Sequence, residues 1–240
     1  MIIYKPTPKI KAMTFDLDDT LYDNWPYIIE AEKGLLNFIA KEYPDSSHLT
    51  KDDWQQYKRS ALRDDPELFS DMGDLRRVVL SKGLEEAGYR GQALERAVQT
   101  CFDWFYFERS NFKVGDAECQ LLAKLSEQIP LIAITNGNVN TQQIGIDGYF
   151  QKVLKASRQS PMKPSPHMFD EAAKLLSIER ASILHVGDHL IKDVWGACNA
   201  GFSSAWHACD RPMKLRNETV QVLPNVEIKH LNELLAFIKS

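Results

Sequence analysis

The sequence is poor in cysteine, and its cysteines form no recognisable pattern. Four occur in 240 residues, at Cys101, Cys119, Cys198 and Cys209, and none belongs to a CxxC pair. Small secreted domains stapled by disulfides carry cysteines at much higher density. We therefore expect reduced and mostly buried thiols, as in a protein of the reducing cytoplasm.

Long apolar runs and excess positive charge are also missing. No stretch approaches the roughly 20 apolar residues of a membrane span, and the first residues lack the apolar region and cleavage site of a signal peptide. Lysine and arginine number 29 against 33 acidic residues, a net charge of -4. This composition favours a cytoplasmic protein that binds neither membrane nor nucleic acid, so any anionic partner must be met by a local site.

What the sequence does contain is typical of a globular protein. Hydrophobic residues make up 44% and charged residues 26% of the 240 residues. This length supports one large domain, or one domain that carries a smaller one.

Three short apolar runs predict strands of a parallel α/β sheet. They cover residues 10–15, 131–134 and 183–186, and each ends at a polar or glycine-containing cluster. Helical patterns separate such runs in α/β proteins, whose ligands bind at the carboxyl ends of the strands. Weaker patterns add strands at 153–154 and 204–207 and helices at 166–176, from 192 and at 231–238. We expect the three clusters to meet in one crevice.

The alternation of strands and helices is interrupted between the first and second clusters. Amphipathic helical patterns there cover residues 25–43, 51–63, 71–87 and 92–110. We predict a separate all-helical cap at 23–113, inserted into an α/β core formed by 1–22 and 114–240.

The residues of the polar clusters suit phosphoryl transfer. Asp16 and Asp18 are paired carboxylates, of which one can attack while the other exchanges a proton. The DLDDT segment on its own could equally be a solvated turn, so the argument depends on the other clusters. Thr135 and Asn136 offer donors for phosphoryl oxygens, and Lys163 offers a positive charge. Asp188 and Asp193 supply hard oxygen ligands of the kind that magnesium prefers.

Four motifs together resemble those of the haloacid dehalogenase-like hydrolases: DLDDT at 16–20, TNG at 135–137, KP at 163–164 and GD at 187–188 with Asp193. The resemblance implies a Rossmann-like core with a helical cap. It implies that Asp16 is the nucleophile, that Asp18 is the general acid and base, and that Thr135, Asn136 and Lys163 bind phosphate. It also implies that Asp16, the main-chain carbonyl of Asp18, and Asp188 hold magnesium with support from Asp193. Dehalogenases of this superfamily lack the second aspartate, so Asp18 favours a phosphatase.

A narrower resemblance concerns the substrate. The segments YKP, FDLDDTLYDN, AITNGN and ILHVGD resemble phosphatases that act on flavin mononucleotide and on the phosphoribitylamino-uracil intermediate of riboflavin synthesis. His189 departs from the pattern, because many relatives have an aspartate there. A phosphatase of sugar phosphates or phosphoglycolate, a phosphomutase and a non-catalytic phosphate-binding module remain alternatives. The oligomeric state is left open.

Overall fold

A seven-stranded sheet forms the centre of the larger lobe in a computed structural model, which describes residues 1–208 and 222–238. The strand order is β1-β7-β6-β5-β2-β3-β4, and neighbouring strands are parallel except β1 and β7. The predicted parallel α/β fold is confirmed. The strands are β1 (Ile2–Ile3), β2 (Ala12–Phe15), β3 (Leu131–Thr135), β4 (Lys152–Lys155), β5 (Ile183–Gly187), β6 (Ser203–His207) and β7 (Val226–Ile228).

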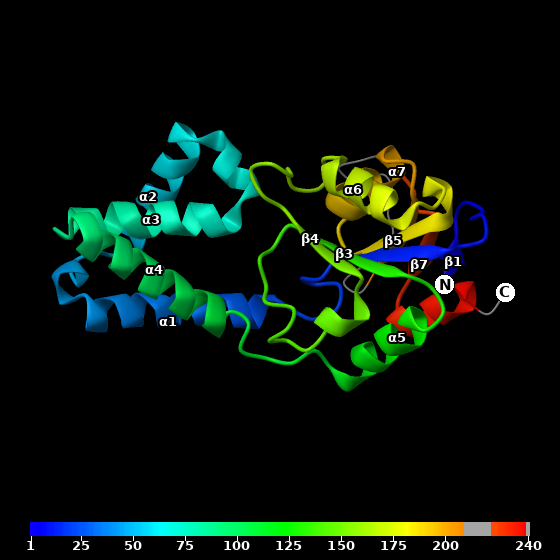
Figure 1. The fold of residues 1–240 in the computed structure, drawn as a ribbon, viewed down its shortest axis with the longest axis horizontal. Helices are drawn as coiled ribbons and strands as arrows, with labels where there is room; N and C mark the ends of the chain where they lie inside the picture. Colours follow the sequence, from blue (N-terminus) through cyan, green and yellow to red (C-terminus); the bar gives the residue numbers. More distant parts are fainter. Residues whose placement is uncertain (209–221, 239–240) are drawn as a thin grey trace.

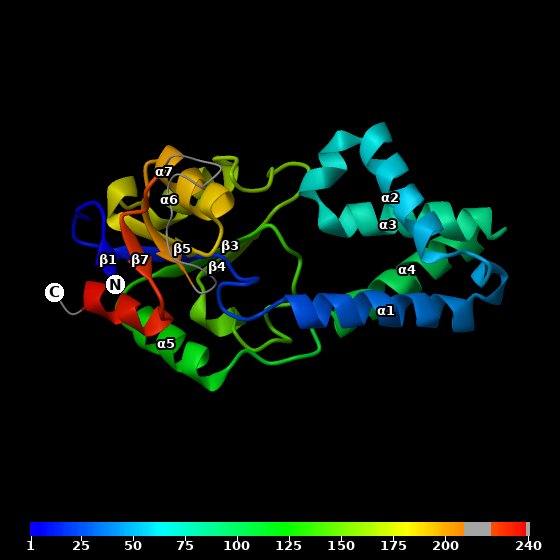
Figure 2. The ribbon, with the colours of Figure 1, turned by 180° about the vertical axis from the view of Figure 1, so that it is seen from behind.

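Helices cover both faces of this sheet (Figure 1). α5 (Asp116–Ser126) and the 3-10 helix η7 (Leu231–Phe237) lie on one face, and α6 (His167–Leu176) and α7 (Gly196–Asn199) on the other (Figure 2). Every residue of β2, β3 and β5 is buried, as expected for central strands with a helical layer on each side. Two apolar clusters, one on each side of the sheet, make up the core of this lobe.

Four helices form a second lobe beside the sheet, with an apolar core of their own. Two of them are capped at their starts: Thr50 and Asp53 form a capping box for the second helix, and the Asp71 carboxylate accepts from Asp74 N at 2.9 Å in the third. The helices are α1 (Trp25–Glu42), α2 (Lys51–Asp64), α3 (Met72–Glu86) and α4 (Gly91–Glu108). They match the four predicted helices to within a few residues.

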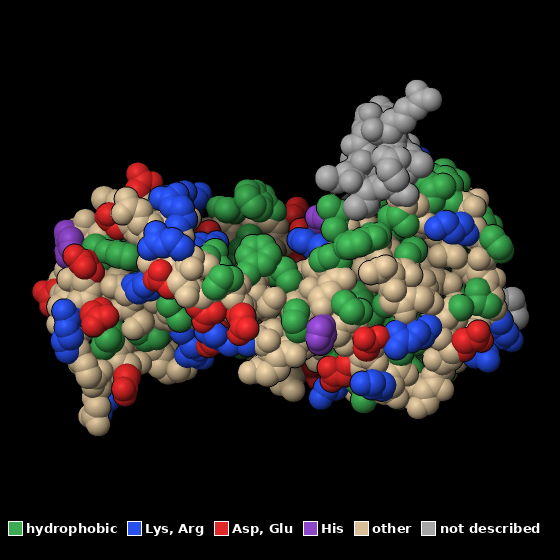
Figure 3. Space-filling view, turned by 90° about the horizontal axis from the view of Figure 1, so that it is seen from above, with side chains coloured by type: hydrophobic (Ala, Val, Ile, Leu, Met, Phe, Trp, Pro, Cys, Tyr) green, Lys and Arg blue, Asp and Glu red, His purple; other side chains and the backbone are tan. Residues whose placement is uncertain are grey.

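A waist separates the two lobes, and hydrophobic side chains lie on either side of it (Figure 3). Contacts also join the two lobes at positions other than the two segments of chain that connect them. Arg158 of the sheet lobe lies 2.6 Å from an Asp65 oxygen and 2.8 Å from an Asp74 oxygen of the helical lobe. Met162 N donates to Ser70 Oγ at 3.3 Å. The helical lobe is thus tied to the loop that leads into Lys163.

Several elements differ from the sequence prediction. The segment expected to be a helix from 192 is a π-helix, η5 (Leu190–Trp195), followed by α7, and the C-terminal helix is of the 3-10 type. The His189 ring caps the π-helix by accepting from the backbone N–H groups of Ile191 and Lys192, at 3.1 and 3.4 Å. The strands β1 and β7 and the helix α5 were not predicted. Further short 3-10 helices are η1 (Pro44–Ser46), η2 (Pro66–Ser70), η3 (Asp147–Tyr149) and η4 (Arg180–Ser182).

The cysteines of the described chain are free, and only Cys101 among them is fully buried. Cys119 and Cys198 are partly exposed, so the expectation of mostly buried thiols is too strong. Cys209 lies outside the described residues. Among the helices of residues 1–208 and 222–238, none is long and apolar enough to cross a membrane.

Candidate active site

The predicted site residues gather where three neighbouring strands end. Asp16 follows β2, Thr135 ends β3, and Asp188 follows β5, and these strands lie side by side and parallel. Their carboxyl ends therefore open on one crevice, as in other α/β sheets. A cavity of about 220 Å³ lies there. Six predicted residues line it, namely Asp16, Asp18, Thr135, Asn136, Lys163 and Asp188.

Lys163 is the central cation of this site. Its Nζ lies 2.7 Å from Asp16 Oδ1 and 2.7 Å from Asp193 Oδ1, and the residue is only 1% exposed. Burial alone lowers the pKa of a lysine, but the two carboxylates outweigh it and raise the pKa of Lys163. Lys163 therefore keeps its positive charge beside Asp16.

The carboxylates outnumber the cation in this buried cluster. Burial raises the pKa of Asp16 to about 8, against the opposing effect of Lys163. Burial, followed by the charge of Asp193, raises the pKa of Asp188 to about 6. Without a further positive charge, these two carboxylates hold protons more tightly than exposed ones do. A divalent cation bound here would supply the charge that keeps both ionised at neutral pH.

Oxygen atoms of Asp16, Asp188 and Asp193 lie within 4.8 Å of one another, close enough to surround one metal ion. Asp193, however, already has a partner on each oxygen. Its Oδ1 accepts from Lys163 Nζ, and its Oδ2 accepts from His189 N at 3.0 Å. This geometry is compatible with the supporting role predicted for Asp193, with Asp16 and Asp188 as the candidate side-chain ligands. An all-oxygen donor set of this kind fits magnesium.

His185 extends the network beneath Asp193. Its Nε2 lies 3.2 Å from Asp193 Oδ1, and its Nδ1 lies 2.8 Å from Thr14 Oγ1. Burial lowers the pKa of His185, so the ring is neutral at physiological pH. It then donates from Nε2 to Asp193 and accepts at Nδ1 from Thr14. Sequence analysis gave His185 no role at the site.

Two glycines permit these close approaches. A Cβ on Gly137 would lie 2.4 Å from Asp18 Oδ2, and a Cβ on Gly187 would lie 2.3 Å from Asp193 Cγ. Both distances are shorter than any real contact, so a side chain at either position would displace an acidic residue. The glycines of the TNG and GD motifs therefore make room for Asp18 and Asp193.

Asn136, predicted to bind phosphate, is held by hydrogen bonds to Lys163. Its side-chain amide donates to Lys163 O at 3.0 Å, and its Oδ1 accepts from Lys163 N at 2.8 Å. The side chain thus fixes the backbone of Lys163 at the edge of the cavity that Asn136 lines. Thr135 Oγ1 accepts from Gly137 N at 3.0 Å, which leaves its hydroxyl hydrogen as a donor.

Asp18 is held by two residues that sequence analysis did not assign to the site. Tyr22 Oη donates to Asp18 Oδ1 at 2.6 Å, and Arg109 Nη2 lies 3.3 Å from the same oxygen. Arg109 is 2% exposed and also donates to Asn24 and Asn138, at 3.0 and 2.9 Å. Burial and the Asp18 charge raise the pKa of Tyr22, so its hydroxyl stays a donor. Tyr22 is close to Asp18 in sequence, but no local signal points to Arg109.

Comparison with known proteins agrees with this geometry. A family model described as haloacid dehalogenase-like hydrolase matches residues 10–201. The chain belongs to the haloacid dehalogenase-like hydrolases. A relative in Escherichia coli, 5-amino-6-(5-phospho-D-ribitylamino)uracil phosphatase YigB, is 32% identical over 99% of this chain and 100% of its own length. Human N-acylneuraminate-9-phosphatase is 25% identical over 97% of this chain and 95% of its own length.

Solved structures of this hydrolase family share the fold. A 2-haloacid dehalogenase from Pseudomonas syringae pv. Tomato DC3000 superposes with a TM-score of 0.89 at 30% identity, covering 96% of this chain and 98% of the other. The magnesium-bound putative hydrolase YfnB from Bacillus subtilis has a TM-score of 0.60 at 20% identity, covering 97% and 100% of the two chains. The second match supports the fold alone.

Proposed function

We propose that this protein is a magnesium-dependent phosphatase that hydrolyses small phosphate monoesters through an aspartyl-phosphate on Asp16. Hydrolysis of phosphoric monoesters is the reaction class that the family and the names of the full-length relatives support. In this proposal residues 1–22 and 114–240 form the catalytic core. Residues 23–113 form a helical cap, since the four helices have a hydrophobic core of their own.

The proposed reaction has two steps. In the first, an Asp16 oxygen attacks phosphorus while Asp18 gives a proton to the departing ester oxygen. In the second, the Asp18 carboxylate takes a proton from water, which attacks phosphorus and frees Asp16 and inorganic phosphate. Lys163 and the Thr135 hydroxyl stabilise the phosphoryl oxygens. Magnesium on Asp16, Asp188 and the Asp18 carbonyl would keep Asp16 ionised and offset phosphate charge.

The position of Asp18 is the observation that carries the proposal. Its carboxylate borders the same cavity as the Asp16–Lys163 ion pair and is held there by Tyr22. A group that can protonate a leaving oxygen is needed for an ester of a poorly acidic alcohol, and is not needed for a departing halide. Asp18 therefore favours phosphate esters.

A 2-haloacid dehalogenase is the second candidate, because a structure of that name is 30% identical to this chain. The two activities are separated by assaying phosphate release from p-nitrophenyl phosphate and chloride release from 2-chloropropionate on one preparation. We expect magnesium-dependent phosphate release. Chloride release without phosphate release would contradict the proposed function and support a dehalogenase.

Flavin mononucleotide and 5-amino-6-(5-phospho-D-ribitylamino)uracil, both of riboflavin metabolism, are the substrates we propose. The name of the Escherichia coli relative supports the second of these. The human relative named for N-acylneuraminate 9-phosphate makes a sugar phosphate the natural competitor. We expect kcat/KM to be highest for the riboflavin compounds in a panel that includes sugar phosphates and phosphoglycolate. A sugar phosphate preferred by about tenfold, about 1.4 kcal/mol of transition-state stabilisation, would overturn this choice of substrate.

A further inference from the structure

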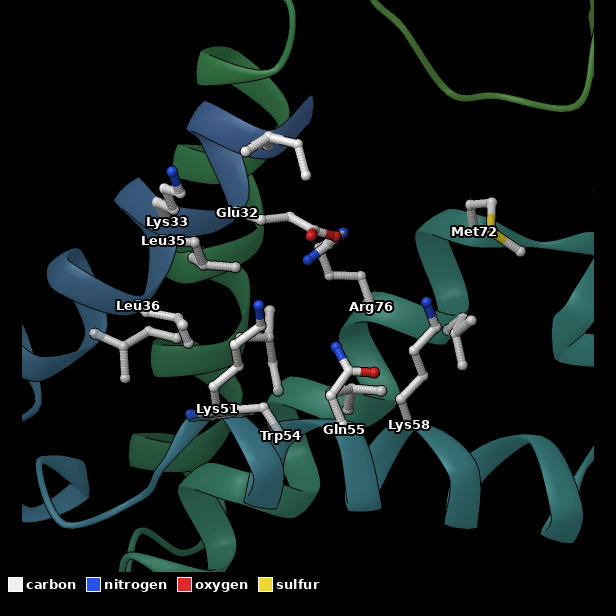
Figure 4. A pocket seen from close by; sticks show the side chains of 15 residues that line it. Glu32, Lys33, Leu35, Leu36, Lys51, Trp54, Gln55, Lys58, Met72 and Arg76 are labelled. Carbon is white, nitrogen blue, oxygen red and sulfur yellow. Dashed lines mark hydrogen bonds and ion pairs between the residues drawn. The ribbon is translucent and has the colours of Figure 1, made fainter. Parts of the chain in front are cut away.

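A groove of about 200 Å³ runs between α1, α2 and α3 of the helical lobe, apart from the cavity at Asp16 (Figure 4). Its lining shares no residue with that cavity. The floor is apolar and consists mainly of buried side chains, namely Leu35, Leu36, Ile39, Trp54, Leu75 and Leu80. An apolar floor of this kind favours a hydrocarbon ligand.

Cations surround this floor. Lys51, Gln55 and Lys58 follow one another at helical spacing along a single face of α2. Figure 4 shows their side chains extending from α2 towards the side of the groove that carries Glu32 and Arg76. Lys33 of α1 adds a further positive charge to the lining. The lining therefore contains four positively charged side chains and one carboxylate, namely Lys33, Lys51, Lys58, Arg76 and Glu32.

Most of this positive charge is uncompensated. Arg76 lies 3.3 Å from Glu32 and 3.5 Å above the ring centre of Phe105. Within residues 1–208 and 222–238, the three lysines of the groove form no ion pair, whereas Lys82 of α3 pairs with Asp64 at 3.1 Å. The chain as a whole has a net charge of -4, so this local excess is positive against an acidic background.

We propose that the groove is a binding site for an aryl carboxylate, an amphipathic anion whose ring lies on the apolar floor and whose carboxylate meets the lysine rim. An apolar cavity of about 150 Å³ accommodates benzene, so this slightly larger groove suits one or two fused rings. The exposed lysines of the rim can bind a carboxylate by charge-assisted hydrogen bonds.

The site is distinct from the one that binds phosphate. Asn24 lines the Asp16 cavity, and Ile39 lines the groove farther along the same helix. At 1.5 Å per residue these two positions are about 22 Å apart, whereas Ile29, the groove residue nearest to Asn24 along the chain, is only about 8 Å from it. The far end of the groove, at Ile39 and Trp54, is therefore separate from the Asp16 cavity.

Calorimetric titration with 2-naphthoate and with its neutral analogue 2-naphthamide tests this proposal on the full chain. We expect the carboxylate to bind more tightly by about tenfold, about 1.4 kcal/mol. In protein labelled with 5-fluorotryptophan, the fluorine resonance of Trp54, assigned with Trp54→Phe, is expected to shift on binding. A shift confined to other tryptophans would place the ligand elsewhere and overturn the proposal.

Two double variants test whether the lysines of the rim bind the carboxylate, or whether the net charge of the protein alone changes the affinity. Lys51→Gln with Lys58→Gln removes two exposed rim charges, and it should weaken 2-naphthoate binding severalfold while leaving 2-naphthamide unaffected. Lys41→Gln with Arg59→Gln makes the same change of net charge on α1 and α2 outside the groove lining, and should change neither. No binding to the unmodified protein, equal affinity for both compounds, or equal losses in both double variants would each overturn the proposal.

Discussion

At the scale of single residues, Asp18 distinguishes a phosphatase from a dehalogenase. Asp18→Asn keeps the size of the side chain but cannot donate a proton to the leaving oxygen. We expect kcat for alkyl phosphates to fall by about 10²–10⁴-fold, and much less for p-nitrophenyl phosphate, whose phenolate leaves unaided. Steady-state rates on both substrates measure the difference. An equal loss on both would contradict the role of Asp18.

Tyr22 provides a milder perturbation of the same group. Tyr22→Phe removes the hydroxyl that lies 2.6 Å from Asp18 Oδ1 while keeping the ring. We expect a drop in kcat for alkyl phosphates with little change in KM, and a loss of unfolding free energy of about 1 kcal/mol. If KM rises and kcat is unchanged, Tyr22 binds substrate and does not position Asp18.

The raised pKa values at the site predict a pH-dependent effect of magnesium. In the metal-free protein Asp16 titrates at about 8 and Asp188 at about 6, so both keep protons that an unfolded chain has lost. Stability of the metal-free protein therefore falls as pH rises from about 5 to 8, because the unfolded state binds fewer protons. Metal binding must displace these protons, so its affinity grows over the same range.

We expect the increase in Tm caused by magnesium to be larger at pH 8 than at pH 6, as measured by differential scanning calorimetry. Asp188→Asn, which removes a proposed ligand, should show a reduced increase at both values. An increase in the unmodified protein that is greater at pH 6 would contradict the assignment of Asp16 and Asp188 as ligands.

At the scale of elements, glycines set how closely the helices of the helical lobe pack. A Cβ on Gly83 of α3 would lie 2.4 Å from Trp54 Cζ3, whereas none of the described atoms outside the adjoining backbone lies within 4 Å of a Cβ on Gly148. Gly83→Ala should therefore lower the free energy of unfolding by about 1–3 kcal/mol through overpacking, despite the better helix propensity of alanine. Urea denaturation measures this loss. Gly148→Ala is the control, and an equal effect of both would contradict the packing argument.

Elements with strong periodicity could be predicted from the sequence. The central strands are unbroken apolar runs, and the helices α1 to α4 have amphipathic patterns. Both kinds of element can therefore be recognised from their own residues alone. β1 and β7 have only two and three residues, and they are defined by the pairing of β7 with β1 and β6, which local sequence does not encode. The His189 ring caps the π-helix through local hydrogen bonds to Ile191 and Lys192, and the helical pattern from 192 did not indicate this π-type turn.

At the scale of the whole molecule, the sequence motifs identified the site residues at the strand ends. They did not identify the residues of the helical lobe that contact the sheet lobe. Asp16, Thr135 and Asp188 could be placed together because parallel strands share an edge. Arg109 reaches Asp18 across 91 residues of sequence, and Arg158 reaches Asp65 across 93. These contacts exist only once the two lobes pack, so no pattern within either segment indicates them.

The central claim is that Asp16 carries the phosphoryl group during turnover. The direct measurement is rapid acid quench of the enzyme with magnesium and p-nitrophenyl phosphate, followed by peptide mass spectrometry. We predict one phosphoryl group on Asp16 in the unmodified protein, and neither adduct nor turnover in Asp16→Asn, which should fold normally. Turnover by Asp16→Asn at a near-normal rate, or a phosphoryl group on another residue, would contradict the account.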